Sequence, residues 1–382
     1  MNDRPAELPA DRRSIDFMVA EIDTIPSVIA EQSARLRAPM RALAEELGRP
    51  HPEVVLTGCG DSHFAGVGAK LALERDAGVR CQALEALELT RYAVRYIPTE
   101  PRPPLLVAIS YSGSVGRTIE AATTARGFGW RTVALTGRAD GRLAQTAEPI
   151  LMDVPTLGFS PGTSTYVAML TALYTLGAEL ARTAGRTEGA ARAEAALAMA
   201  PDLARETIRL ATEPAQRAAE TVAAAGTSTF IGSGPHRASA EFGAAKLFEG
   251  PQRYGVAQQL EEWAHEQYFV SGPTTPIVVI APSGAARDRA GELLAEMAFI
   301  GAPTILVSDV TDDAVAGSAT VVLPIATGLD EAYSPLLTCL PLALTAFFLA
   351  ERLGATSYGF PSAEHEIEHY ETIHRDTRGT PA

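Results

Sequence analysis

A strand, a glycine turn and a helix follow one another repeatedly in this sequence, and the whole series occurs twice. Apolar and β-branched runs turn through glycine and then take up helical spacing. The corresponding segments are residues 53–74, 104–129 and 131–137 in the first half and residues 228–249, 275–297 and 302–309 in the second. Because the offset stays at about 173 residues, the sequence predicts two copies of one domain.

Successive strand and helix units predict the fold class. Parallel strands need a crossover connection, usually a helix, so three such units in a row predict a parallel sheet flanked by helices. We therefore expect an α/β fold with two tandem domains, each a flavodoxin-like three-layer arrangement. The expected divisions are an N-terminal segment and helix at 1–48, domain one at 49–205, domain two at 206–350 and a C-terminal tail at 351–382.

Composition and charge narrow the function classes. The chain has 382 residues and a formal net charge of −14, which disfavours nucleic acid and anionic membranes as partners. Its longest apolar run, residues 335–350, contains Pro341 and is shorter than the roughly 20 residues that span a bilayer, so we expect a buried helix. The three cysteines have no CxxC spacing, and the first thirty residues lack the apolar core of a signal peptide. We expect a cytoplasmic protein.

The loop "SYSGSVGRT" at residues 110–118 follows the apolar run "PLLVAI". Ligands of parallel α/β sheets bind at the carboxyl ends of strands, where helix N-termini favour anions. The hydroxyls of Ser110, Ser112, Ser114 and Thr118 would add donors for an anion. N-capping is the alternative, but a cap needs one serine. The equivalent turn in the second copy, "APSGA", lacks the hydroxyls, so we expect one anion site in each chain.

Two further residues, Asp61 and Ser62 in "GCGDSH", follow the neighbouring strand of the first copy. Strands that are neighbours in a parallel sheet end at the same edge, so these side chains are expected to line the same crevice. A role in capping the following helix or in the turn remains the alternative.

Lysine is scarce in this chain, which has 30 arginines and only Lys70 and Lys246. Lys246 lies three residues before Glu249 in "GAAKLFEG", and this spacing places an ammonium and a carboxylate on one helix face. A solvated surface pair is the alternative. Because the helix follows a glycine turn and leads into a polar segment, we predict a functional role for Glu249.

Glu262 and His265 follow in "LEEWAHEQYF". A histidine beside carboxylates can be held in one tautomer and can transfer protons near neutral pH. Taken alone, His265 is better explained as a structural or surface histidine.

The tail contains "HEIEH" at residues 365–369, formally the spacing of a zinc site with Glu366 as base. The pattern is short and lies in an acidic terminal segment. We expect a solvated or lid-like helix there, and no metal.

Several motifs together resemble the SIS (sugar isomerase) family, most closely its double-SIS members in the isomerase half of glucosamine-6-phosphate synthase. Over roughly residues 15–350, five segments agree in order and spacing with the family's motifs. They are "DFMVAEIDTIPSVI" (16–29), which resembles "FMxKEIxEQP", then "GCGDSH", "ISYSGS" and "GAAKLFE", and finally "EEWAH", which stands where the family has "GELKHG".

The resemblance implies an assignment of roles. The substrate's anion pocket would comprise Ser62, Ser110, Tyr111 and Ser112. Glu249 would move a proton between sugar carbons C1 and C2, with Lys246 beside it. His265 would open the sugar ring and, as in the family, would reach the site from the partner subunit of a homodimer. No redox cofactor is implied.

Departures from the family pattern concern the anion. Val115 replaces the threonine of the family's "SxSGxT", and Arg117 is the residue that would supply charge instead. Asp61 replaces a threonine, and His365 is the nearest residue to the missing lysine of the family's "PRNLAK". Glu262 is a further residue expected to bind the substrate. We expect a phosphorylated sugar, or alternatively a sulfonated one.

The sequence thus predicts an aldose–ketose isomerase for an anionic sugar, working through an enediol. No amidotransferase segment is recognisable in the sequence, so we do not expect glutamine-dependent amination. Two alternatives remain: an amino-sugar phosphate deaminase or deglycase that releases an amine, and a non-catalytic sugar-binding SIS protein. No helix-turn-helix pattern precedes residue 50, which disfavours a DNA-binding sensor.

Overall fold

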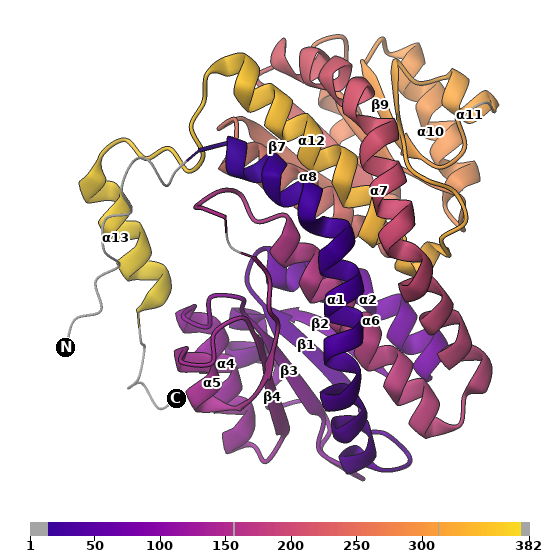
Figure 1. Ribbon diagram of the computed structural model, residues 1–382. Helices are drawn as coiled ribbons and strands as arrows, with labels where there is room; N and C mark the ends of the chain where they lie inside the picture. Colours follow the sequence, from indigo (N-terminus) through magenta and orange to yellow (C-terminus); the bar gives the residue numbers. More distant parts are fainter. Residues whose placement is uncertain (1–13, 156, 312, 376–382) are drawn as a thin grey trace.

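The computed structural model describes residues 14–155, 157–311 and 313–375 (Figure 1). The first copy contains the strands β1 (Val54–Gly58), β2 (Cys81–Glu85), β3 (Leu105–Ile109), β4 (Arg131–Thr136) and β5 (Glu148–Leu151). Its helices, with the two π-helical turns η2 and η3, are α1 (Asp16–Leu47), α2 (Asp61–Ala72), η2 (Leu73–Ala77), α3 (Ala86–Glu88), η3 (Leu89–Ala93), α4 (Gly116–Gly127), α5 (Arg142–Thr146) and α6 (Ser164–Ala184).

Helix α7 (Thr187–Ala223) leads from the first copy into the second. The strands of the second copy are β6 (Thr227–Gly232), β7 (Tyr254–Gln259), β8 (Ile277–Ile280), β9 (Thr304–Ser308) and β10 (Val321–Pro324). Its helices, with the 3-10 turns η4 and η5, are α8 (His236–Glu249), α9 (Leu260–His265), η4 (Gln267–Val270), α10 (Arg287–Phe299), α11 (Ala314–Gly317), η5 (Glu331–Tyr333), α12 (Pro335–Leu353) and α13 (Ala363–His374).

Both sheets are parallel and have the same strand order, which confirms the predicted duplication. The orders are β2-β1-β3-β4-β5 and β10-β9-β8-β6-β7. Counted from the first strand of each copy, both read 2-1-3-4-5, the flavodoxin-like order. The order reverses beside the first strand of each sheet, so a crevice opens there at the carboxyl edge.

The glycine turn after the first strand is also repeated in three dimensions. Gly60 and Gly234 both have φ of 56°, a backbone conformation that favours glycine. Two residues earlier, a Cβ on Gly58 would collide with Ser62, and one on Gly232 would collide with the His236 carbonyl. Glycine at these positions lets each helix start close behind its strand.

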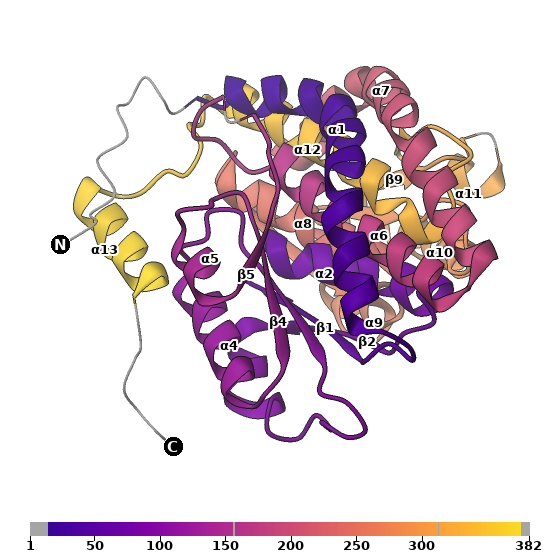
Figure 2. The ribbon, with the colours of Figure 1, turned by 60° about the horizontal axis from the view of Figure 1, so that its bottom comes forward.

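The two sheets share one central helical layer. The inward faces of both sheets and the helices α1, α6, α7, α8 and α12 contribute to a single hydrophobic cluster (Figure 2). Alternate strand residues such as Val55 and Leu106 point outward, where α3, α4 and α5 cover the first sheet. Helices α9, α10 and α11 cover the outer face of the second sheet.

Helix α12 is the predicted buried helix. By length and composition it could cross a membrane, but 78% of its most apolar window is buried inside the molecule. The predicted N-terminal helix is present as α1. The predicted division between residues 205 and 206 falls within α7, a helix that is continuous from Thr187 to Ala223.

Candidate active site

The candidate site lies where the strand order of the first sheet reverses, between β1 and β3. These strands pair in parallel, with Thr57 opposite Ala108, so the loops that follow them leave the sheet side by side. Residues 59–61 lead into α2, and residues 110–115, here called the anion loop, lead into α4. This edge is where ligands of doubly wound sheets bind.

The anion loop presents donors at the start of a helix. Val115, the N-cap of α4, makes no side-chain cap, so the first backbone N–H groups of the helix lack a partner within it. The side chain of Ser112 accepts a hydrogen bond from the Ser114 hydroxyl at 3.0 Å. Ser110 is 2% exposed, and its hydroxyl has no partner among the described residues. The loop therefore has the donor-rich form expected of an anion site.

Three other residues predicted for the pocket make packing contacts around it. The Ser62 hydroxyl lies 3.4 Å from the Met169 sulfur. The Thr118 hydroxyl is directed at the Cys59 sulfur, 3.8 Å away. The Tyr111 hydroxyl donates to the Val154 carbonyl at 3.0 Å. The Tyr111 bond holds the anion loop against the segment after β5, and the Thr118 contact ties α4 to the turn after β1. The predicted substrate contacts of the three residues remain predictions.

Lys246 joins the two copies at the centre of the site. Its side chain is fully buried, and its Nζ donates to Asp61 Oδ2 at 2.8 Å and to Glu249 Oε2 at 2.6 Å. Asp61 begins α2 of the first copy, while Lys246 and Glu249 belong to α8 of the second. The structure thus brings Asp61 to Lys246 and Glu249, although Asp61 lies 185 residues before Lys246 in the sequence. Here they are called the lysine triad.

Burial controls the protonation of the triad. Burial alone lowers the pKa of the Lys246 ammonium, but the carboxylates of Asp61 and Glu249 outweigh it, and the pKa rises above its ordinary value. Burial raises the pKa of the Glu249 carboxyl, and the charge of Lys246 offsets only part of this. Glu249 remains 26% exposed at its side chain. A carboxylate with a raised pKa that solvent and small molecules can reach is suited to proton transfer.

Glu21 on α1 is a buried acid that the residue patterns did not single out. It is 5% exposed and accepts hydrogen bonds from the hydroxyls of Thr163 and Ser164, each at 3.4 Å. Burial raises its pKa from 4.5 to about 7, although these bonds and the charge of Lys246 oppose the shift. Its position matches the glutamate of the "FMxKEIxEQP" pattern, which is the signal that could have identified it.

The C-terminal tail, residues 354–375, runs from the triad to the anion loop. The Tyr358 hydroxyl donates to Glu249 Oε2 at 3.3 Å, and its backbone N–H donates to the Glu249 carbonyl at 2.8 Å. The Tyr358 ring lies 4.8 Å from that of Phe159. Farther along, α13 stands to one side of the molecule, and its end contacts α4 (Figures 1 and 2). The predicted terminal helix is therefore present; none of its residues is buried, and its last residue, His374, lies at the anion loop.

The tail meets the anion loop through His374 rather than through the predicted His365. The His374 Nε2 lies 3.3 Å from the Ser114 hydroxyl. His365 is exposed, and its Nδ1 bonds the hydroxyl of Ser362, the N-cap of α13, at 2.8 Å.

The predicted Arg117 pairs with Glu120 at 2.5 Å and donates to the Arg375 carbonyl at 3.2 Å.

Glu262 and His265 lie outside this cluster. The His265 side chain is 70% exposed, and its Nε2 is 3.5 Å from Glu261 Oε1, one helical turn away. Glu262 is exposed on the same short helix, α9. Within one chain, these two residues form no hydrogen bond or ion pair with the lysine triad, so their roles remain predictions.

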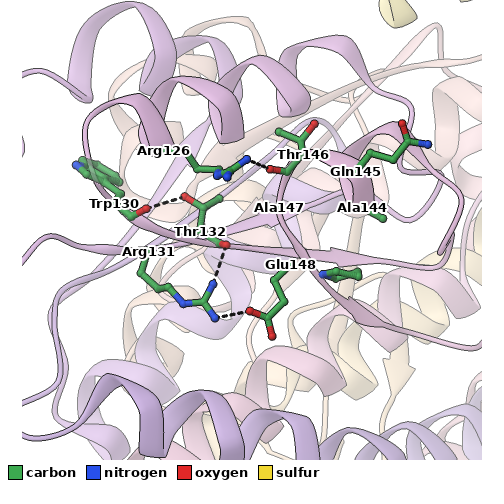
Figure 3. Close-up of a pocket in the computed structure, with 10 residues that line it drawn as sticks. Arg126, Trp130, Arg131, Thr132, Ala144, Gln145, Thr146, Ala147 and Glu148 are labelled. Atoms are coloured by element: carbon green, nitrogen blue, oxygen red, sulfur yellow. Dashed lines mark hydrogen bonds and ion pairs between the residues drawn. The ribbon is translucent and has the colours of Figure 1, made fainter.

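A separate pocket of about 430 Å³ lies at the opposite edge of the first sheet (Figure 3). It is lined by the start of β4, the start of β5 and the ends of α4 and α5. Its cations are already engaged: Arg131 pairs with Glu46 and Glu148, and Arg126 donates to the Thr146 carbonyl. Among residues 14–375, apart from 156 and 312, no group of three His, Cys, Asp or Glu is placed to hold a metal ion.

Comparisons with known proteins agree with this geometry. Residues 49–178 match the family model of the SIS domain. A glutamine–fructose-6-phosphate aminotransferase (isomerizing) of Zymomonas mobilis is 27% identical over 348 residues, which cover 87% of this chain and 56% of that protein. The chain thus spans about half the length of the curated relatives it matches.

Solved structures show the same fold. The C-terminal domain of glucosamine-fructose-6-phosphate aminotransferase from Francisella tularensis superimposes with a TM-score of 0.77 and 21% identity, covering 90% of this chain and 98% of that one. Tagatose-6-phosphate ketose/aldose isomerase from Escherichia coli gives a TM-score of 0.67 at 18% identity, covering 88% and 93%. At these identities the likeness establishes the two-sheet architecture.

Proposed function

We propose that the chain, of which residues 49–178 match the SIS domain family, interconverts the aldose and ketose forms of a sugar that carries an anionic group. The observation that supports this most directly is the lysine triad, in which the Glu249 carboxylate is fixed by a buried ammonium 2.6 Å away and remains partly exposed. The names of the relatives, an isomerizing aminotransferase and a ketose/aldose isomerase, point to the same class of substrate.

The chemistry requires one carboxylate that serves two carbon atoms. Glu249 would take the proton from C2 of the open-chain aldose and return it to C1 of the resulting enediol. Its raised pKa lets it hold the proton between the two steps. Lys246 would not touch the sugar; its two ion pairs hold the Glu249 carboxylate in one orientation.

The anionic group of the sugar would bind at the anion loop. The unpaired N–H groups at the start of α4 and the hydroxyls of Ser110 and Ser112 would donate to it. Phosphate is the proposed group, in keeping with the sugar phosphates that the relatives' names contain. Sulfonate is the alternative, since Val115 offers no hydroxyl where the family pattern has threonine.

Ring opening would need a second chain. His265 is exposed and pairs with Glu261 rather than with the triad of its own chain, and it would serve as the ring-opening acid and base in the site of a homodimer partner. A mixture of His265→Ala and Glu249→Gln chains would then regain activity that neither variant has alone.

Solvent exchange tests the proposal. In deuterated water, wild-type protein should incorporate deuterium at C2 of a hexose 6-phosphate or a 6-sulfonated hexose, and Glu249→Gln should lower the rate by about 10²–10⁴-fold. Glu74→Gln is the matched control because Glu74 forms the other lysine pair of the chain, with Lys70 at 2.7 Å on α2. Exchange that persists in Glu249→Gln would remove Glu249 as the base.

Product analysis separates the alternative functions. Release of ammonia or an amino acid from aminated sugars, without ketose formation from plain aldoses, would replace the isomerase with a deaminase or deglycase. Thermal stabilisation by sugar phosphates without any turnover would indicate a non-catalytic sugar-binding protein.

A further inference from the structure

Two arginines at the anion loop hold consecutive backbone carbonyls of the tail. Arg142 Nη1 donates to the His374 carbonyl at 2.8 Å, and Arg117 Nη2 donates to the Arg375 carbonyl at 3.2 Å. The two guanidinium groups come from different helices, α5 and α4, and they converge on one short piece of chain. Together they are called the arginine pair.

Arg142 is fixed to the anion loop through its neighbours. The backbone N–H of Leu143 donates to the Gly113 carbonyl at 2.9 Å, so the first turn of α5 is anchored to the loop. A Cβ on Gly113 would lie 3.4 Å from the Gly141 backbone. The sequence between β4 and β5 therefore contributes a cation to the site, although no pattern around residue 142 resembles a binding motif.

Gly116 makes room for the tail at the first turn of α4. A Cβ at this position would collide with the Arg375 carbonyl oxygen, so the absence of a side chain lets that oxygen approach the helix start. The oxygen thus lies near the helix N-terminus, at the Arg117 guanidinium. An oxygen of partial negative charge occupies the place where the electrostatic field of the loop is most favourable to an anion.

We propose that Arg142 and Arg117 together bind the anionic group of the substrate, and that the carbonyl groups of His374 and Arg375 occupy this place until the anion displaces them. The proposal rests on the proposed function, because it assigns further residues to the same anion site. A guanidinium forms stronger hydrogen bonds with an ionised oxygen than with a neutral carbonyl, so an anion has the advantage over these two carbonyl groups. Two guanidinium groups at an angle suit a tetrahedral oxyanion with three terminal oxygens, such as phosphate or sulfonate.

The pairing of Arg117 with Glu120 is compatible with this role. Glu120 Oε2 binds Nη1 of Arg117, whereas Nη2 is the nitrogen that donates to the tail. Glu120 also receives Arg91 at 2.6 Å, which offsets part of its charge. The carboxylate orients Arg117 without occupying the nitrogen that would face the anion.

Inorganic phosphate and inorganic sulfate are the probes for the test, with affinity measured by calorimetry on the full chain. Arg142→Gln should raise the dissociation constant of phosphate at least about 10-fold, since one charge-assisted contact is lost. Arg138→Gln is the control: it removes the same charge nearby, but the Arg138 guanidinium pairs with Asp140 at 3.2 Å. Equal phosphate affinity in wild type and Arg142→Gln, with both proteins folded, would overturn the assignment of Arg142.

Displacement of the tail has its own readout, amide hydrogen exchange over residues 363–375. Phosphate should speed exchange there while it slows exchange over residues 111–119. Slower exchange in the tail would mean that the tail closes over the anion, and the placeholder role would be overturned. Tyr370→Ala removes the ring that lies 6.3 Å from Phe159 and should loosen the tail, lowering the phosphate dissociation constant. An unchanged or higher phosphate dissociation constant in Tyr370→Ala would likewise overturn the proposal that the tail competes with the anion.

Failure of this inference can be told apart from failure of the proposed function. The phosphate measurements do not depend on turnover, so a chain that isomerises no sugar can still show the displacement. Conversely, normal solvent exchange in Arg142→Gln at unchanged KM, with unchanged phosphate affinity, would remove the arginine pair and leave the isomerase proposal standing.

Discussion

The anion loop of the first copy has a counterpart in the second copy, residues 281–286, which is filled by the chain's own acids. Both carboxylate oxygens of Glu331 accept from the backbone N–H of Ala285, each at 3.1 Å, and Asp309 Oδ1 accepts from that of Ser283 at 2.7 Å. In the anion loop, the Ser112 hydroxyl accepts from the Ser114 backbone N–H at 3.4 Å, and the tail carbonyls accept from the arginine pair. The same turn thus binds carboxylates in one copy, and it is met by hydroxyl and carbonyl oxygens in the other.

The first residue of the helix that follows each loop also differs between the two copies. Gly116 of α4 leaves space, whereas Arg287 stands at the start of α10. The Arg287 side chain is 12% exposed and lies against the loop, where it donates to the Ala281 carbonyl and the Ser308 hydroxyl and pairs with Asp313. The turn of the second copy is therefore held by the chain's own ions, whereas the turn of the first copy has glycine and hydroxyl groups at the equivalent places. Predictions follow from pairs of equivalent positions.

The two lysines should differ most. Lys246→Met leaves the carboxylates of Asp61 and Glu249 without their shared cation, and we expect a loss of about 3–5 kcal/mol in the free energy of unfolding. Lys70→Met removes an exposed pair with Glu74 and should cost less than about 1 kcal/mol. Urea unfolding of both variants checks this. Equal losses would mean that the buried pairing is not the reason lysine is present at 246.

The buried acid of the first copy should give a smaller, pH-dependent effect. The pKa of Glu21 is raised by burial from 4.5 to about 7, so between these values the unfolded chain has lost a proton that the folded chain keeps. Stability therefore falls as pH rises through this window, by up to about 3 kcal/mol. Glu21→Gln should remove that fall. Unfolding measured at pH 5 and pH 8 would show parallel curves for both proteins if the prediction is wrong.

His236 in the second copy is the control for Glu21, because it should change the stability with pH in the opposite direction. His236 Nε2 bonds the hydroxyl of Ser334, just before α12, at 2.7 Å, as Glu21 bonds Ser164 at the start of α6. Burial lowers the pKa of His236 from 6.5 to about 4, so its contribution is complete above pH 6.5 and is lost as pH falls toward 4. His236→Gln should flatten the acid side of the stability profile only.

The smallest expected effect comes from a variant that makes the loop at residues 281–286 more like the anion loop. Glu331→Ala frees the N–H of Ala285, which is exposed, and should cost about 1 kcal/mol of stability. Phosphate should then bind this loop weakly, raising the number of phosphate sites in each chain from one to two at high concentration. Calorimetry gives that number. A single site in Glu331→Ala would show that the hydroxyls of the anion loop, and not the turn itself, determine binding.

The fold could be predicted from the sequence because each unit of strand, glycine turn and helix is specified by residues that are neighbours in the chain. Glycine at 60 and 234 is required by a positive φ that follows from a strand turning directly into a helix, and such turns are visible in the sequence. The parallel sheets and the repeated order follow from these units. The continuity of α7 through the predicted division at 205 could not be predicted, because Pro201 in that helix reads as a break.

The candidate site was predictable where residue spacing alone brings groups together. Lys246 and Glu249 lie on one helix face at a spacing of three, and their contact follows. Glu21 and Arg142 carry no such signal, since their positions depend on how α1 packs on α6 and how α5 abuts the anion loop. For the same reason, the sequence indicated His365 for closing the site, whereas the path of the tail brings His374 to it.

The central layer shared by the two sheets has a consequence for how the molecule comes apart. Each sheet has its inner face against the same helices, and α12 of the second copy packs extensively on α7 and also touches α1. Removing either copy would therefore strip apolar cover from the other. We expect the duplicated halves to unfold as one cooperative unit, and neither should refold alone as an independent fragment.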